Sequence, residues 1–284
     1  MGGARDSLTG RRKRPQWLPS ALQWGLRTLH HVRTKAAQAE RMLQGFARAA
    51  LTLDDLKAMT IQTYAAQSDR FAQPFPWEER WWKHALPATP GRILVGGCGR
   101  GREVRALIAR GYEVSAFDPT VDAARDCQQL QPAPTFVGCF GYEELAASVR
   151  ADGTSALLLS DVAYDAVLMG WGSLSHVLDE KSQADAIKAC ARLAPHGPVL
   201  ASFLITQSNS GRGRAERIGY ELGARLVRAG RAVPHADQPI EYVARGGFVY
   251  FFSEPRLEAL ARECGRRLEL NLQDGYPHAT FWPV

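Results

Sequence analysis

Residues 93–104 read ILVGGCGRGREV and place three glycines, Gly97, Gly99 and Gly101, at alternate positions after an apolar run. Glycine has no Cβ and adopts positive φ readily, so such a turn lets a ligand approach the backbone closely. The strict dinucleotide pattern G-x-G-x-x-G fails because Arg102 stands at its sixth position, and no lysine follows as a phosphate-binding P-loop requires. The turn nevertheless predicts a binding site for a nucleoside cofactor.

An acidic residue strengthens this prediction. Asp118 ends the next apolar segment, 21 positions after Gly97. If both segments are neighbouring parallel strands, Asp118 lies beside the glycine turn, where its carboxylate can accept hydrogen bonds from ribose hydroxyls. The spacing therefore predicts a cofactor with a ribose near the turn.

Other side chains with chemical potential lie in or after this region. His176 is the best general-base candidate, because imidazole titrates near neutral pH, although it could equally pack against or cap the next helix. Trp171 could line a pocket for an aromatic or apolar substrate, or it could belong to the core. We interpret Cys98 as a small filler of the turn and not a nucleophile, because the sequence places no histidine or acid to activate it.

The elements that must position these residues alternate along the chain. Apolar residues at helical spacing predict a helix over 20–50, a capping box at Thr52 and Asp55 opens a second helix, and a third begins near Pro76. Beyond residue 91, short apolar strands alternate with helices, which predicts an α/β fold with a mostly parallel sheet. The strands are expected at 92–97, 113–118, 135–140, 164–170, 198–205, 248–252, 267–273 and 278–284.

We therefore expect three regions. Residues 1–19 form a basic flexible tail, residues 20–90 a helical N-terminal extension or cap, and residues 91–284 the main domain. Residues 206–247 interrupt the alternation after the fifth strand, and their length predicts a lid insertion.

The segment RILVGGCGRGREVRALIARGYEVSAFDPT resembles motif I and the following acidic strand of class I S-adenosylmethionine-dependent methyltransferases. YDAVLMGWGSLSHV resembles the fourth-strand motif of that family, and the likeness extends over about residues 91–205. The resemblance implies a Rossmann-like, seven-stranded, mostly parallel sheet flanked by helices, with the last strand antiparallel. It also implies S-adenosyl-L-methionine as the cofactor.

The resemblance also implies site residues. The methionine part of the cofactor would lie over the glycine turn, its ribose on Asp118, and its methyl group near the end of the fourth strand. The implied cofactor-binding residues are Gly97, Cys98, Gly99, Gly101, Asp118, Pro119, Glu143 and Gly170, and the implied substrate-facing residues are Trp171 and Ser173. Two positions depart from the family pattern: Val95 replaces a frequent acid, and Glu143 or backbone groups must serve where the family often has an acid after the third strand.

Charge is distributed unevenly over the 284 residues. Residues 1–50 contain ten arginines and lysines against Asp6 and Glu40, a net charge of +8, whereas the whole chain carries +6. A basic arm can contact RNA, DNA or an acidic membrane surface, but more often it is a solvated tail. Nucleic acid is accordingly a secondary expectation.

The composition argues against disulfide-rich, metal-binding and membrane-spanning proteins. The five cysteines are scattered and never in C-x-x-C spacing, so we expect reduced thiols and neither a disulfide framework nor a metal site. No uninterrupted apolar run reaches the roughly 18 residues of a membrane span, and we expect a cytoplasmic protein.

The leading hypothesis is methyl transfer to an O, N or S atom of a small molecule or peptide. An RNA or protein methyltransferase guided by the basic arm is one alternative, and a non-catalytic S-adenosylmethionine-binding module is another. A nicotinamide-dependent dehydrogenase is the last, disfavoured by Arg102.

Overall fold

The computed structural model describes residues 18–65, 73–158, 163–206, 214–227 and 238–284. The expected basic tail therefore lies almost wholly outside the described residues.

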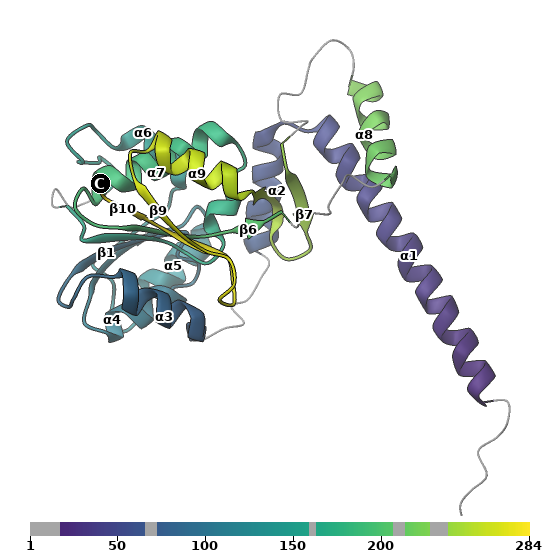
Figure 1. Ribbon diagram of the computed structural model, residues 1–284, viewed down its shortest axis with the longest axis horizontal. Helices are drawn as coiled ribbons and strands as arrows, with labels where there is room; N and C mark the ends of the chain where they lie inside the picture. The colour runs from purple at the N-terminus through teal and green to yellow at the C-terminus, as the bar shows by residue number, and fades with distance from the viewer. Residues whose placement is uncertain (1–17, 66–72, 159–162, 207–213, 228–237) are drawn as a thin grey trace, which may run out of the picture.

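A seven-stranded sheet forms the centre of the main domain, in the order β3-β2-β1-β4-β5-β10-β9 (Figure 1). Its strands are β1 (Arg92–Gly96), β2 (Glu113–Phe117), β3 (Phe136–Gly138), β4 (Ala166–Met169), β5 (Val199–Ser202), β9 (Arg267–Asn271) and β10 (His278–Trp282). β1 to β5 pair in parallel, and β10 runs antiparallel to both of its neighbours. The predicted Rossmann-like sheet with an antiparallel last strand is confirmed.

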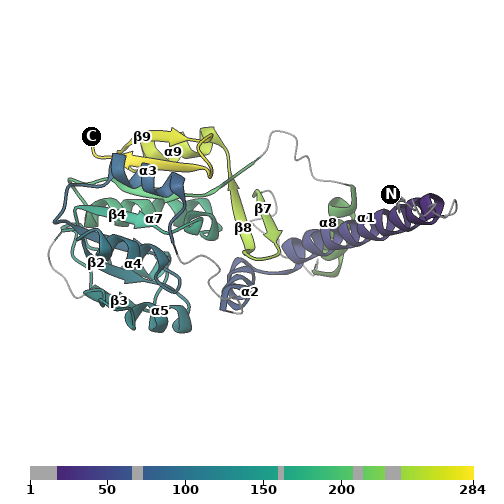
Figure 2. The ribbon, with the colours of Figure 1, turned by 90° about the horizontal axis from the view of Figure 1, so that it is seen from below.

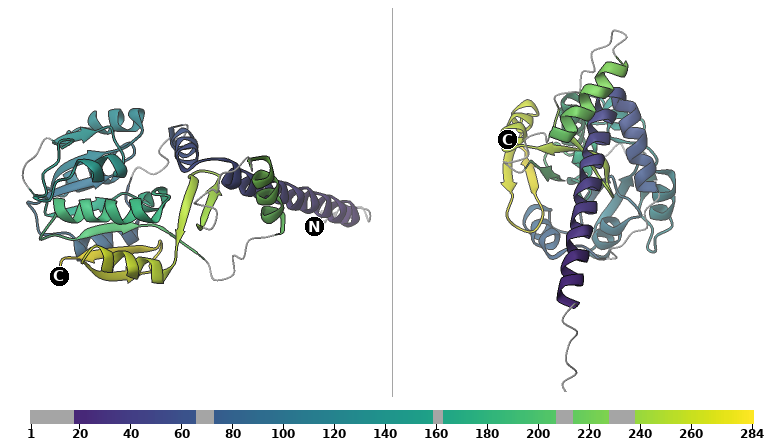
Figure 3. Two further views of the ribbon diagram at one scale, coloured as in Figure 1. Left: turned by 90° about the horizontal axis from the view of Figure 1, so that it is seen from above. Right: turned by 90° about the vertical axis from the view of Figure 1, so that its right-hand side faces the viewer.

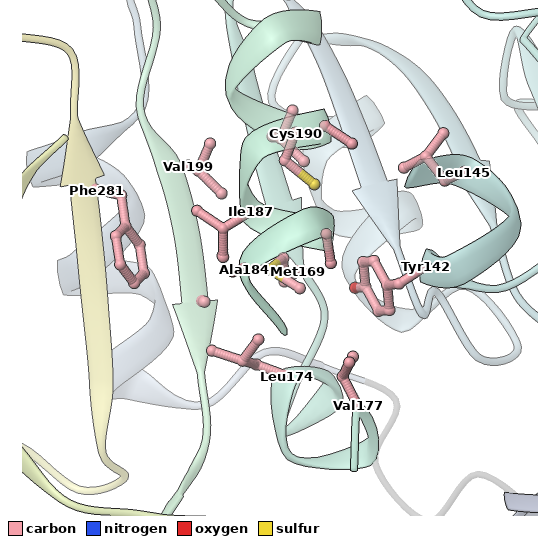
Figure 4. Packing of buried hydrophobic residues seen from close by; sticks show 14 of the residues in the cluster. Tyr142, Leu145, Met169, Leu174, Val177, Ala184, Ile187, Cys190, Val199 and Phe281 are labelled. Carbon is pink, nitrogen blue, oxygen red and sulfur yellow. The ribbon is translucent and has the colours of Figure 1, made fainter. Parts of the chain in front are cut away.

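Helices cover both faces of this sheet (Figure 2). They are α3 (Pro76–Ala85), α4 (Arg102–Ala109) and α5 (Val121–Gln128) on one face, and α6 (Tyr142–Ser148), α7 (Glu180–Leu193) and α9 (Glu254–Glu263) on the other. The strand residues alternate between the two cores: Ile93 and Val95 of β1 face the α3–α5 side, and Leu94 faces α7. Figure 4 shows the core on the α6, α7 and α9 side, where Ile187 of α7 points toward Val199 of β5.

A second, three-stranded sheet lies beyond the carboxyl ends of β4 and β5, in the order β6-β8-β7 (Figure 3). It consists of β6 (Leu204–Ile205), β7 (Ile240–Val243) and β8 (Gly247–Phe252). The predicted single strand over 198–205 is wrong, because it divides at Phe203 into β5 and β6. The segment predicted as a strand at 248–252 belongs to this small sheet and not to the main one.

The small sheet is covered by helix α2 (Leu53–Ala65), which lies against β8. Thr60 fixes the contact: its hydroxyl donates to Phe248 O at 3.2 Å and accepts from Phe248 N at 2.9 Å. Burial under α2 explains why the β8 sequence is apolar on both faces, like that of a central strand. We call α2 and the three small strands together the cap.

The long helix α1 (Leu18–Ala50) begins far from the main domain and ends beside the cap (Figure 1). Helix α8 (Arg214–Val227) packs across the C-terminal part of α1 at glycines: a Cβ on Gly45 would lie 2.1 Å from Glu216 O, and one on Gly219 would lie 1.8 Å from Met42 O. Buried Arg48 pairs with Glu216 at 2.5 Å across the same contact. The predicted helix over 20–50 and the capping box at Thr52 and Asp55 are both confirmed.

Candidate functional site

The glycine turn connects the carboxyl end of β1 to the first turn of α4. Gly97, Gly99 and Gly101 have φ of +61°, +53° and +88°, the left-handed region that residues with a Cβ rarely adopt. A Cβ on Gly99 would meet nothing within 4 Å. The turn therefore presents bare backbone to open space, which is the surface a bound nucleoside cofactor requires.

Asp118 follows β2 and stabilises this turn directly. Its Oδ2 accepts a hydrogen bond from Gly99 N at 2.9 Å, and its Oδ1 accepts one from Thr120 N at 2.8 Å. The residue is 7% exposed. Each carboxylate oxygen can accept more than one hydrogen bond, so these backbone contacts leave acceptor capacity for ligand hydroxyls.

A cavity of about 260 Å³ lies next to Asp118. The carboxyl end of β2 contributes Asp118 and Pro119 to its wall, and the start of α6 contributes Tyr142 and Glu143. Helix α2 closes the opposite side. Glu143 accepts a hydrogen bond from Lys57 Nζ of α2 at 2.5 Å, which ties the cap to the main domain across the mouth of the cavity.

A second cavity, of about 480 Å³, adjoins the first along Gly97, Gly99 and Asp118. Cys98 lines its floor, while Trp171 and Tyr276 line its side. The two aromatic rings meet edge to face with centroids 5.7 Å apart. The small sheet supplies the far wall through Leu204, Val243, Arg245, Gly246 and Val249.

His176 lines both cavities from the short helix η1 (Ser173–His176), which follows β4. Its ring lies edge to face against Tyr64 of α2, with centroids 5.0 Å apart. Its Nδ1 is buried and has no hydrogen-bond partner among the described residues. Burial lowers the pKa of His176 to about 4, so the imidazole is neutral at neutral pH.

Ser173 is held against the glycine turn. Its hydroxyl and the phenol of Tyr142 share a hydrogen bond of 2.8 Å, and its Cβ would lie 2.7 Å from a Cβ on Gly97. Burial raises the pKa of Tyr142 well above its usual value, so the phenol stays protonated. The side chain of Ser173 thus helps position η1 as well as lining the first cavity.

A cluster of buried ionisable side chains lies next to the second cavity. Arg102 pairs with Glu78 of α3 at 2.6 Å and with Glu103 at 2.7 Å, and all three side chains are buried. Burial raises the pKa of Glu78, an effect that Arg102 opposes. Glu103 also accepts a hydrogen bond from Trp171 N at 3.2 Å. The cluster holds one more carboxylate than cations and fixes the backbone at the end of β4.

The structure gathers most of the residues proposed from the sequence around the two cavities. Those that line them are Gly97, Cys98, Gly99, Asp118, Pro119, Glu143, Trp171, Ser173 and His176. Gly101 and Gly170 lie outside the cavity walls. A Cβ on Gly101 would lie 2.5 Å from Leu130 Cδ1, and one on Gly170 would lie 2.5 Å from Gly97 O, so both glycines permit close packing behind the turn.

Few sequence features identify the remaining residues that line the two cavities. The sequence offers Tyr64 of the helical extension and Tyr276 near the edge of the sheet as candidates by position alone. Tyr276 lies between β9 and β10, outside the cap, and both side chains line the second cavity. Lys57, Val243 and Arg245 carry no motif, because their contribution depends on how the cap folds over the turn. Arg70, a further candidate from position, lies outside the described residues.

Among the described residues, no helix is long and apolar enough to cross a membrane, and no group of three or more histidine, cysteine or acidic side chains is placed to hold a metal. The five cysteines are free thiols.

Residues 94–201 match the family model described as a methyltransferase domain. No curated protein has a significantly similar sequence.

Solved structures share the fold at low identity. A SAM-dependent methyltransferase from Leishmania major has 14% identity and a TM-score of 0.53, over 83% of this chain and 87% of that one. A SAM-dependent methyltransferase from Methanosarcina mazei has 17% identity and a TM-score of 0.46, over 75% and 100%. A Rhodobacter sphaeroides protein whose name proposes a zinc-dependent alcohol dehydrogenase has 15% identity and a TM-score of 0.50, over 80% and 97%. At these identities the two likenesses with TM-scores of 0.53 and 0.50 establish the fold alone.

Proposed function

We propose that the domain matched over residues 94–201 is a class I S-adenosylmethionine-dependent methyltransferase, and that the enzyme methylates an O, N or S atom of a small molecule. The observation that carries the proposal is the pair of adjoining cavities, one beside Asp118 and one walled by the cap. The second cavity is closed by side chains from α2, β7 and β8, which suits a small acceptor better than an extended macromolecule.

The residues of the turn suit the cofactor. Gly99 leaves open space above the backbone, Asp118 offers acceptor capacity for ribose hydroxyls, and Glu143 lines the same cavity, where the adenine amino group would need an acceptor. Glu103 of the Arg102 cluster lines the second cavity, where its carboxylate would favour the positively charged end of the methionine part.

S-adenosylmethionine supplies an activated methyl group, so the protein has to align the acceptor, exclude water and, for an acidic acceptor, remove a proton. We assign the removal of this proton from the acceptor to His176. Its imidazole is neutral and lines both cavities, so the ring nitrogen that carries no proton can accept one. Trp171 and Tyr276 would orient an acceptor with an aromatic or apolar body.

The free thiols are compatible with a reducing compartment, and we propose that the enzyme works in the cytoplasm.

A release assay tests the acceptor class. The full chain is incubated with S-adenosylmethionine and, separately, with panels of small phenols, amines and thiols, with total RNA and with protein extract, while S-adenosylhomocysteine is measured. The proposal expects release with at least one small-molecule panel and a large decrease in rate for His176→Asn. Release only with RNA or protein would contradict it.

A further inference from the structure

The N-terminal part of α1 carries large apolar side chains in contact with solvent. Trp24, Leu26, Leu29 and Val32 are 72%, 68%, 68% and 59% exposed, and Leu43 is 65% exposed. Figures 1 and 3 show this part of the helix extending away from the main domain and the cap. Isolated exposed leucines are ordinary, but a row of them along one helix marks an interaction surface.

The aliphatic residues of this set share one side of the helix, and Trp24 lies on the opposite side. At 100° per residue, Leu26, Leu29, Val32, Ala36 and Leu43 fall within about 120° of arc. Helix α8 does not cover this side, since it packs at Met42 and Gly45, which both lie well outside the arc. We call the side formed by these five residues the apolar stripe.

Positive charge predominates in this segment. Arg27, Lys35 and Arg41 lie on the other side of the helix from the apolar stripe, whereas Arg33 and Glu40 fall within the arc of the stripe, and all five are exposed. Glu40 is the single acidic residue of the segment 24–43, so its four arginines and lysines leave a net charge of +3. The segment is therefore basic with its aliphatic side chains gathered on one side, and Trp24 lies near its N-terminal end on the opposite side.

We propose that this segment of α1 binds flat on an anionic lipid bilayer. The apolar stripe would enter the boundary between headgroups and acyl chains, and the cations would lie among the lipid phosphates. A length of about 30 Å for 20 helical residues lets the whole segment lie in the interface.

Charge argues against the other occupants of this surface. A second copy of α1 would bring two basic helices together, which costs electrostatic free energy. A nucleic acid would neutralise the cations but leave the apolar stripe in water. An anionic bilayer satisfies both sides of the helix at once.

The connection to the cap gives this docking a consequence. Helix α1 ends at Ala50, and α2, which lines the cofactor cavity, begins at Leu53. A bilayer bound by α1 would thus lie near the cap. The nearness of the bilayer to the cavities bears on the supply of substrate only if the proposed function holds. The docking of α1 on the bilayer does not depend on that function.

Vesicle flotation of the full chain tests the docking. The probes are vesicles of phosphatidylcholine alone and vesicles with about 30 mol% phosphatidylglycerol. The variants are Leu29→Glu and Val32→Glu in the apolar stripe. Thr34→Glu, on the polar side of the same helix, is the matched control because it adds the same charge. Retained binding of S-adenosylhomocysteine shows that each variant is folded, and a failure of that binding in the wild type would count against the proposed function alone.

The docking predicts binding to the anionic vesicles that weakens as salt is raised. Leu29→Glu and Val32→Glu should weaken it at least about tenfold, and Thr34→Glu less than about threefold. Equal losses for Leu29→Glu and Thr34→Glu, or no preference for anionic vesicles, would overturn the proposal. So would a dimer in solution that Leu29→Glu dissociates without any vesicle binding, or RNA binding by a protein that does not float with vesicles.

Discussion

At the scale of single residues, Asp118 has two tasks in the site. Its carboxylate holds the glycine turn through Gly99 N and the start of α5 through Thr120 N, and the same group faces the first cavity. A carboxylate fixed in this way is oriented before a ligand arrives, which reduces the entropy lost on binding.

Replacing Asp118 by alanine should therefore weaken the binding of S-adenosylhomocysteine at least tenfold. The expected loss is about 1.5–3 kcal/mol, the usual contribution of hydrogen bonds to a charged group. Calorimetric titration measures it directly. Asp122→Ala removes the same charge from an exposed position in α5 and should bind as the wild type does. Equal affinities for the two variants would show that Asp118 does not contact the ligand.

His176 makes the folded protein sensitive to acid. Burial lowers the pKa of His176 to about 4, below the ordinary value of 6.5 that it takes in the unfolded chain. Between these two pH values the unfolded chain binds a proton that the folded protein excludes, so stability falls as the pH falls through this range and is unaffected above it.

The free energy of unfolding should accordingly decrease by up to about 3 kcal/mol more in the wild type than in His176→Asn when the pH falls from 7.5 to 4.5. Urea denaturation of the wild type and of His176→Asn at the two pH values measures the decrease for each protein. Burial also lowers the pKa of His278, but that residue is present in both proteins and cancels from the comparison. Identical decreases would contradict a neutral, buried His176.

At the scale of elements, the sequence predicts the main domain much better than the cap. The strands of the main sheet follow from apolar runs bounded by glycine and proline, and Gly97 and Asp118 lie at the carboxyl ends of neighbouring strands because β1 and β2 pair in parallel. The register that brings Gly96 opposite Phe117 is a property of the paired sheet.

The cap shows where local patterns stop being informative. Its strand β8 has the apolar character of a central strand of the main sheet, yet it pairs only with β6 and β7 among the described strands and is buried between α2 and the main domain. Lys57 and Arg245 reach the cavities only because these distant segments fold together. Periodicity within one segment contains no information about such pairings.

From the contact between α1 and α8 we predict an effect on stability opposite to the one that helix propensity predicts. Glycine inside a helix is usually less stable than alanine by about 1 kcal/mol. Gly219→Ala should nevertheless destabilise the protein, because the added Cβ would lie 1.8 Å from Met42 O. Thermal unfolding and limited proteolysis of α8 measure the effect. An unchanged or higher melting temperature would mean that the two helices do not cross this closely in solution.

At the scale of the whole molecule, the structure combines an α/β domain that matches a methyltransferase family model over residues 94–201, a cap over the glycine turn and a basic helical arm. The cap connects the other two parts, since α2 follows α1 directly and Lys57 of α2 contacts Glu143 of the domain. Cofactor binding is the property on which the proposed functions of the site depend.

Titration of the full chain with S-adenosylmethionine, S-adenosylhomocysteine and NAD tests that property most directly. We predict micromolar affinity for the two adenosyl ligands, at least tenfold weaker in Asp118→Ala, and no comparable affinity for NAD. Tight binding of NAD, with none of the adenosyl ligands, would contradict the account and assign the glycine turn to a dinucleotide.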